Sequence, residues 1–172
     1  MESHVISDVN LVAMAWAREH AGERLGTKWY DGEASTELSE NWPVSESVRL
    51  AIRQIVTEAF GRATPISELT ESIRAASGFT KEQARIVAET EASFAMVRGN
   101  YEAWRKMGLV RSVKWTISTL LHTERDACDL NREAGAVPFG QPFPSGDIAP
   151  PQHPGCRCSL GIVELIEPKG RP

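Results

Sequence analysis

Three cysteines and one histidine near the C-terminal end are the residues most suited to chemistry in this chain. Cys156 and Cys158 follow His153 in the segment His-Pro-Gly-Cys-Arg-Cys, and Cys128 lies upstream of them. Thiolate sulfur and imidazole nitrogen are the ligands that zinc prefers, and four of them complete a tetrahedral structural site. The residue types therefore predict a structural zinc site formed by Cys128, His153, Cys156 and Cys158.

The spacing of these residues leaves other interpretations open. Structural zinc ligands usually come in two closely spaced pairs, but Asn131 stands where a C-x2-C partner of Cys128 would be. The cysteines can instead be buried thiols, or Cys128 can form a disulfide with one of the other two. His153 can hold a proline-rich loop through hydrogen bonds to carbonyl groups. Apart from zinc, we expect no cofactor.

Zinc deaminases supply an alternative functional hypothesis, a zinc-dependent enzyme that modifies nucleic acids. Such enzymes carry an H-x-E element and a P-C-x-x-C element. His122 and Glu124 fit the first element, but the cysteine pair here is C-x-C and Gly155 separates it from the preceding proline. The sequence also has no Walker loop, no G-x-S-x-G and no G-x-G-x-x-G motif. We therefore expect that the chain is not an enzyme.

A group of charged residues lies within a helical pattern. Arg85 precedes Glu89 by four residues, which predicts an ion pair on one face of a helix. Glu91 faces a different direction, where a buried hydrogen bond or an ion pair would account for it. Arg157 stands between the last two cysteines, and two alternatives are open for its side chain. It can bind a carboxylate, with Glu91 as a candidate partner, or it can lie in solvent between two inward-facing thiols, which strand alternation favours.

Helical periodicity dominates the first two thirds of the chain. Apolar stripes and capping residues predict helices over about Asp8–Gly26, Ser45–Gly61 and Thr64–Gly78. Thr80 and Gln83 have capping-box spacing, and this pattern runs on to Gly108. It predicts one long central helix of roughly 40 Å. Gly99 inside it costs about 1 kcal/mol relative to alanine, so we expect a bend or a close neighbour there.

The period then changes from helical to alternating. Alternation of apolar and polar residues over Val113–Ile117, around Trp115, predicts a half-buried strand. A second strand is predicted from Cys158 to about Ile166, and prolines such as Pro151 predict an irregular loop before it. We expect a single α+β domain over residues 1–172. It is mainly helical over 1–110, with a small antiparallel sheet and the proline-rich loop in 111–172.

Composition restricts the classes of function. The 172 residues are 41% hydrophobic and 24% charged, as in globular proteins, and no apolar run is long enough to span a membrane. The formal charge is −4, with 12 basic and 16 acidic residues over 1–110 and 7 of each over 111–172. An acidic helical part argues against binding DNA mainly through its phosphates. We expect weak DNA contact, no membrane association and synthesis in the cytoplasm.

Several motifs follow one another in a recognisable order. They are Ala84-Arg85-Ile86-Val87-Ala88-Glu89-Thr90-Glu91, Gly99-Asn100, Gly108, Trp115, Asp126-Ala127-Cys128 and Pro150-Pro151-Gln152-His153-Pro154-Gly155-Cys156-Arg157-Cys158. In this order they resemble the phage Mu protein F-like family of head morphogenesis proteins. The resemblance extends from about Trp42 to Ile166.

The resemblance implies a function that the residues alone do not. It implies a non-enzymatic minor capsid protein of a tailed bacteriophage, with a role in procapsid assembly and in DNA packaging or delivery. The implied partners are the phage portal protein and the major capsid or scaffold proteins. The implied location is the virion, in the phage head, after synthesis in the host bacterial cytoplasm.

Overall fold

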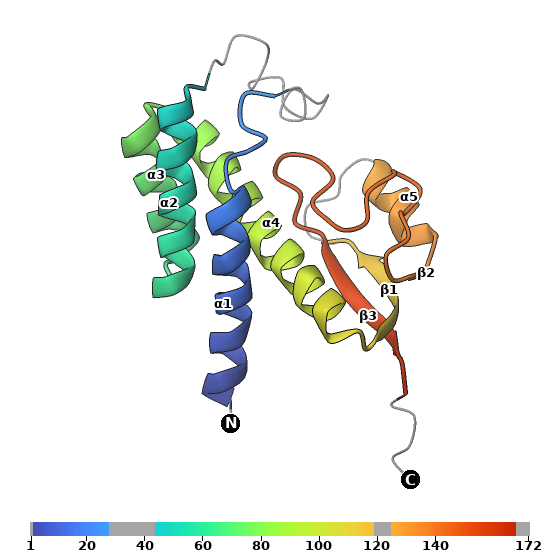
Figure 1. Ribbon diagram of the computed structural model, residues 1–172. Helices are drawn as coiled ribbons and strands as arrows, with labels where there is room; N and C mark the ends of the chain where they lie inside the picture. The colour runs from blue at the N-terminus through green and yellow to red at the C-terminus, as the bar shows by residue number, and fades with distance from the viewer. Residues whose placement is uncertain (1, 28–43, 119–124, 168–172) are drawn as a thin grey trace.

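Helices make up most of the protein, and a small sheet lies to one side of them (Figure 1). The computed structural model describes residues 2–27, 44–118 and 125–167. The helices are α1 (Glu2–His20), α2 (Glu46–Arg62), α3 (Ile66–Ser77), α4 (Lys81–Met107) and the short α5 (Ala127–Glu133). The strands are β1 (Val110–Thr116), β2 (Ala136–Pro138) and β3 (Ser159–Leu165). This arrangement confirms the predicted α+β class.

Capping residues set the ends of α2 and α4 as the sequence predicts. The Ser45 hydroxyl accepts a hydrogen bond from the backbone of Val48 at the start of α2. Thr80 and Gln83 form a reciprocal capping box at the start of α4, and Gly108 ends that helix in the left-handed conformation. The prediction for α1 was wrong at its start, because the helix begins at Glu2 and not at Asp8.

Helix α4 is the long central helix, with 27 residues. It packs against α1 and α3, and its C-terminal end leads directly into β1 (Figure 1). Gly99 of α4 lies against the backbone of α1. A Cβ atom at that position would lie 2.7 Å from the carbonyl oxygen of Val12 and 2.9 Å from the backbone nitrogen of Ala13. The expected close neighbour of Gly99 is therefore the backbone of α1.

The sheet is antiparallel, with the strand order β2-β1-β3. Val113 in β1 lies opposite Val137 on one side and Ile162 on the other. The predicted pairing of the Trp115 strand with the C-terminal strand is confirmed, and Trp115 lies opposite Leu160. Strand β2 and helix α5 were not predicted. Both strands that flank β1 are edge strands within the described residues.

Two hydrophobic cores are present, one on each side of α4. The larger core lies among α1 to α4 and includes Leu25, Ile52, Val56, Ile73 and Val87. The smaller core lies beside the sheet and consists of Val110, Val113, Trp115, Cys128, Phe143, Cys156 and Cys158. Thus all three cysteines belong to the core of the sheet side. None of the helices in the described ranges is both long and apolar enough to cross a membrane.

Candidate functional site

The three cysteine side chains meet in the small core beside the sheet. Cys128 lies in the first turn of α5, where the Asp126 carboxylate caps the helix and accepts the backbone N–H of Cys128 at 2.7 Å. Cys156 and Cys158 lie at the end of the proline-rich loop, directly before β3. All three are buried free thiols, and their sulfur atoms lie within 4.8 Å of one another. The Sγ atoms of Cys128 and Cys156 are 3.7 Å apart.

His153 lies at the margin of this cysteine cluster. Ligand atoms of His153, Cys128 and Asp126 also lie within 4.8 Å of one another. The ring nitrogen Nδ1 donates to the carbonyl oxygen of Pro154 at 2.9 Å, as the loop-holding interpretation predicts. The other nitrogen, Nε2, is buried, lies 3.2 Å from Asp126 Oδ2 and makes no well-aligned hydrogen bond to any described residue. The ring is therefore fixed through Nδ1, while Nε2 faces Asp126 and the cysteine cluster.

The electrostatics of the cluster favour a thiolate. Hydrogen bonds from Cys128 and Cys158 hold the pKa of the Cys156 thiol far below its usual range, and His153 acts in the same direction. The pKa of Cys128 is raised, mainly because its thiol donates to Cys156. Burial lowers the pKa of His153, but hydrogen bonding to Cys156 and the charge on that sulfur outweigh burial and raise it to about 9. The cluster thus concentrates negative charge on sulfur.

Trp115 forms one wall of the same core. Its ring packs edge-to-face against Phe143, with 5.2 Å between the ring centroids. Its buried Nε1 has no well-formed hydrogen bond to any described residue, but its N–H lies towards the sulfur of Cys158. Hydrogen bonds from Cys128 and, more weakly, Trp115 lower the pKa of the Cys158 thiol, but hydrogen bonding to Cys156, burial and the charge on Cys156 outweigh them and raise it to about 11. Trp115 therefore packs in the core with its N–H directed at the Cys158 sulfur.

Arg157 pairs with Glu89, and not with the candidate partner Glu91. The carboxylate of Glu89 receives Arg157 Nη2 at 2.5 Å and Arg85 Nη1 at 2.8 Å. The local pair of Arg85 with Glu89 is thereby confirmed. Arg157 is 45% exposed and stands between two buried cysteines, as strand-like alternation predicts. Because of the rotation of α4, Glu89 and not Glu91 faces the loop.

The next two residues of α4 hold two further segments. Thr90 Oγ1 accepts the backbone N–H of Gly155 at 2.8 Å, and the buried Glu91 accepts the backbone N–H of Gly22 at 2.9 Å. Glu91 also lines a polar cavity of about 230 Å³ together with Arg24 and other residues. Glu89, Thr90 and Glu91 therefore connect α4 to the proline-rich loop and to the turn after α1. The contact of Thr90 could not be predicted from the sequence, because a threonine within a helix carries no signal of a long-range contact.

The proline-rich loop has a second anchor at Asn131. This side chain is fully buried in α5, donates to Ser145 Oγ at 2.9 Å and accepts the backbone N–H of Ser145 at 3.0 Å. Pro151 is also buried. Asn131, which occupies the place of a missing C-x2-C cysteine, is therefore an anchor of the loop and faces Ser145.

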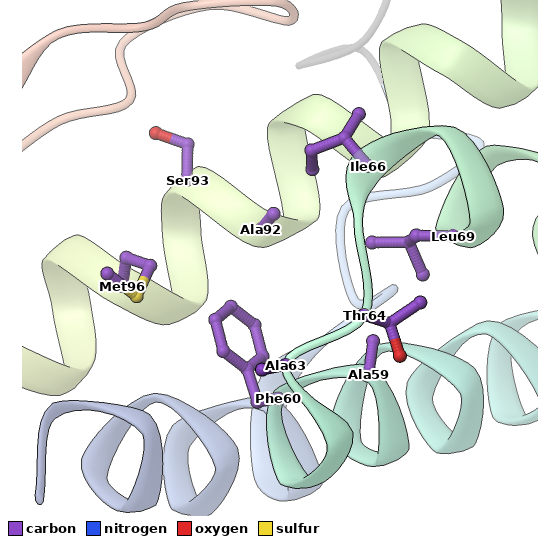
Figure 2. A pocket seen from close by; sticks show the side chains of 9 residues that line it. All are labelled: Ala59, Phe60, Ala63, Thr64, Ile66, Leu69, Ala92, Ser93 and Met96. Atoms are coloured by element: carbon purple, nitrogen blue, oxygen red, sulfur yellow. The ribbon is translucent and has the colours of Figure 1, made fainter. Parts of the chain in front are cut away.

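An apolar cavity lies on the helical side of the molecule, where α2, α3 and α4 meet (Figure 2). It has a volume of about 360 Å³ and is lined by Ala59, Phe60, Ala63, Thr64, Ile66, Leu69, Ala92, Ser93 and Met96. Figure 2 shows the Phe60 ring and the Met96 side chain facing each other across it. None of the nine lining residues is titratable, so the cavity offers shape and apolar surface but no acid or base. No local pattern in the sequence predicts this cavity.

His122 and Glu124, on which the deaminase hypothesis depends, lie outside the described residues. Among the described residues, Cys128, Cys156 and Cys158, and likewise Asp126, Cys128 and His153, lie close enough together to hold a metal ion. A model of the family described as "Phage Mu protein F like protein" matches residues 51–161. This range runs from α2 through α4 and the sheet to β3, and it includes the cysteine cluster. No curated protein and no solved structure matches the chain. The match covers more than half of the chain, which therefore belongs to the phage Mu protein F-like family of bacteriophage head morphogenesis proteins.

Proposed function

We propose that this protein is a minor capsid protein that associates with the portal or the inner shell of a tailed-phage head. There it supports procapsid assembly and DNA packaging or delivery. Membership of the family supports the role in head morphogenesis. The part of the proposal that concerns docking to a partner depends on one surface of the structure.

The observation that carries the docking proposal is the exposed apolar edge strand β3. On one side it pairs with β1, and no strand among the described residues pairs with its other side. The side chains of Ile162, Val163 and Leu165 are 40%, 48% and 57% exposed. An exposed apolar edge strand is a template for pairing with a strand of another chain. A head protein with this surface can add a strand from a capsid partner.

The charge distribution favours a protein partner over DNA. The chain carries a formal charge of −4, and residues 1–110 contain the whole excess of acidic residues. Packaged DNA repels such a surface, since nonspecific DNA binding depends on neutralising phosphates with basic side chains. Contacts between proteins therefore locate the molecule in the head, and its contact with DNA stays weak.

Co-purification with the portal protein of the same phage tests the proposal. The tagged protein is co-expressed with portal or shell subunits and washed at moderate salt. Wild-type protein and Leu50→Lys, a control at an exposed apolar position of α2 (51% exposed), should retain the partner. A Val163→Lys/Leu165→Lys variant should retain at least about tenfold less of the partner than wild type does, because charged side chains block pairing at a sheet edge.

Different results would contradict the association with portal or shell subunits and the docking through β3. Folded wild-type protein that retains neither portal nor shell subunits would contradict the association itself. Equal retention by the β3 double variant and by wild type would leave the association standing and would exclude β3 as the docking strand. Circular dichroism of each variant establishes that it is folded.

A further inference from the structure

The spacing of the cysteine sulfurs fits a shared metal ion. A Zn–S distance of about 2.3 Å and a tetrahedral angle place two thiolates on one zinc about 3.8 Å apart. The sulfurs of Cys128 and Cys156 are 3.7 Å apart, and the Cys158 sulfur lies within 4.8 Å of both. A disulfide needs about 2.05 Å between its sulfurs. We propose that Cys128, Cys156, Cys158 and His153 bind one structural zinc ion.

His153 supplies the fourth ligand through its Nε2 atom. This nitrogen is buried and lacks a well-aligned hydrogen bond to any residue that the structure describes. Its Nδ1–H donates to the Pro154 carbonyl, and a hydrogen bond of this kind fixes the tautomer and the ring orientation in metal-bound histidines. The Nδ1–H bond thus leaves Nε2 as the ring nitrogen that a metal ion would bind, displacing any proton there.

Asp126 is the competing candidate for the fourth position, and its existing contacts argue against it. Its Oδ1 atom already accepts the backbone N–H groups of Cys128 and Asp129 as the cap of α5. Its Oδ2 lies 3.2 Å from His153 Nε2, which places the carboxylate beside the imidazole. A site with three thiolates also prefers nitrogen to carboxylate oxygen as its remaining ligand. Asp126 therefore acts as a cap and as a neighbour of the ligand.

The surroundings of the cluster suit bound thiolates. Trp115 presents its buried Nε1–H towards the Cys158 sulfur, and donors of this kind stabilise sulfur that carries negative charge. Three thiolates also select zinc over magnesium or calcium, which require oxygen ligands. The donor set and its neighbours therefore point to the same metal.

The small size of the core beside the sheet indicates that the zinc ion would stabilise this side of the molecule. The sheet side is built around seven buried residues, and three of these are the cysteines. A core of that size supplies little stability, and small units commonly depend on a metal or a disulfide. Zinc at this position would join α5 to the end of the proline-rich loop directly before β3. The ion would thereby hold together two segments that are distant in sequence.

Metal content and thiolate spectroscopy of the full chain test the proposal. Protein expressed with added zinc should contain about one zinc per chain, and cobalt exchanged into the site should give thiolate-to-cobalt charge-transfer absorption with tetrahedral d–d bands. Cys156→Ser and His153→Gln should reduce the bound zinc several-fold at limiting metal. Asp126→Asn keeps a capping side chain on α5 and should still hold about one zinc.

Three outcomes that overturn the proposal can be read from wild-type protein alone, so they do not depend on the folding of a variant. Zinc near zero in folded protein after expression with added zinc overturns it, and so does cobalt binding without thiolate charge transfer. A mass loss of two hydrogens that maps to a disulfide between Cys128 and Cys156 or Cys158 would overturn it as well. Retention of full zinc by His153→Gln with loss in Asp126→Asn would overturn the assignment of the fourth ligand. The test involves no head partner, so its result is independent of the proposed function.

Discussion

Gly99 provides the sharpest test of how the helices are packed. A Cβ at this position would lie 2.7 Å from Val12 O, 2.8 Å from Val12 C and 2.9 Å from Ala13 N. All three are backbone atoms of α1, so no side chain can rotate away to make room. We therefore expect Gly99→Ala to push α1 away from α4, although the substitution favours helix formation by about 1 kcal/mol.

The expected magnitude follows from the two opposing effects. Overpacking costs about 1–3 kcal/mol, and separation of α1 from α4 also loosens the fully buried Ala13 and Ala17. We expect a net loss of about 1–2 kcal/mol in the free energy of unfolding. For a chain of this size the melting temperature should fall by about 2–8 °C.

Gly61 in α2 is the matched control. A Cβ there would meet only the sulfur of Met14, at an ordinary distance of 3.5 Å. Gly61→Ala should therefore raise the free energy of unfolding by about 0.5–1 kcal/mol through helix propensity alone. Urea unfolding followed by circular dichroism measures both variants. A Gly99→Ala protein as stable as wild type, with an unchanged dependence on urea, would refute the close packing of α1 on α4.

Two further substitutions test the anchors of the proline-rich loop. Thr90→Val removes the acceptor for the Gly155 N–H and should lower the free energy of unfolding by about 1–3 kcal/mol. Thr90→Ser keeps the hydroxyl and should retain most of the wild-type stability. Equal urea midpoints for the two variants would contradict this contact. Asn131→Ala removes both hydrogen bonds to Ser145 and should lower the melting temperature by several degrees, at about 2–4 °C per kcal/mol. Its zinc content should stay at the wild-type value, since Asn131 faces Ser145, and loss of zinc would show that the loop position depends on this anchor.

The sequence predicts best those elements that carry both a period and a cap. Helices α2 and α4 have apolar stripes with Ser45 and Thr80 at their starts, and both caps form as expected. Strand β1 shows clear alternation around a buried Trp115. In contrast, β2 has three residues and α5 has seven, which is too short for a period to show.

The candidate site could be predicted by residue type but not by contact. The cysteines and His153 carry their chemistry in their identity, so the sequence identifies them as a group. Which carboxylate meets Arg157 depends on the rotation of α4 relative to the loop, and Glu89 occupies the position for which Glu91 was a candidate. The cavity in Figure 2 depends on how three helices leave space between them, and no local pattern encodes such a space.

The contacts of α4 explain how one helix can organise both sides of the molecule. Glu89 and Thr90 hold the proline-rich loop, and Glu91 holds the turn after α1, so three consecutive residues fix the sheet side relative to the helices. The cysteine cluster fixes the same end of the loop to α5, and Asn131 holds the loop further back at Ser145. With the end of the loop held from both α4 and α5, β3 leaves it in a defined direction while its outer edge and its apolar side chains stay exposed. A strand held in this way is preorganised for docking, because the partner need not supply the free energy to order it. The residues that carry the family resemblance therefore act at a distance from the proposed partner surface, by holding β3 in position.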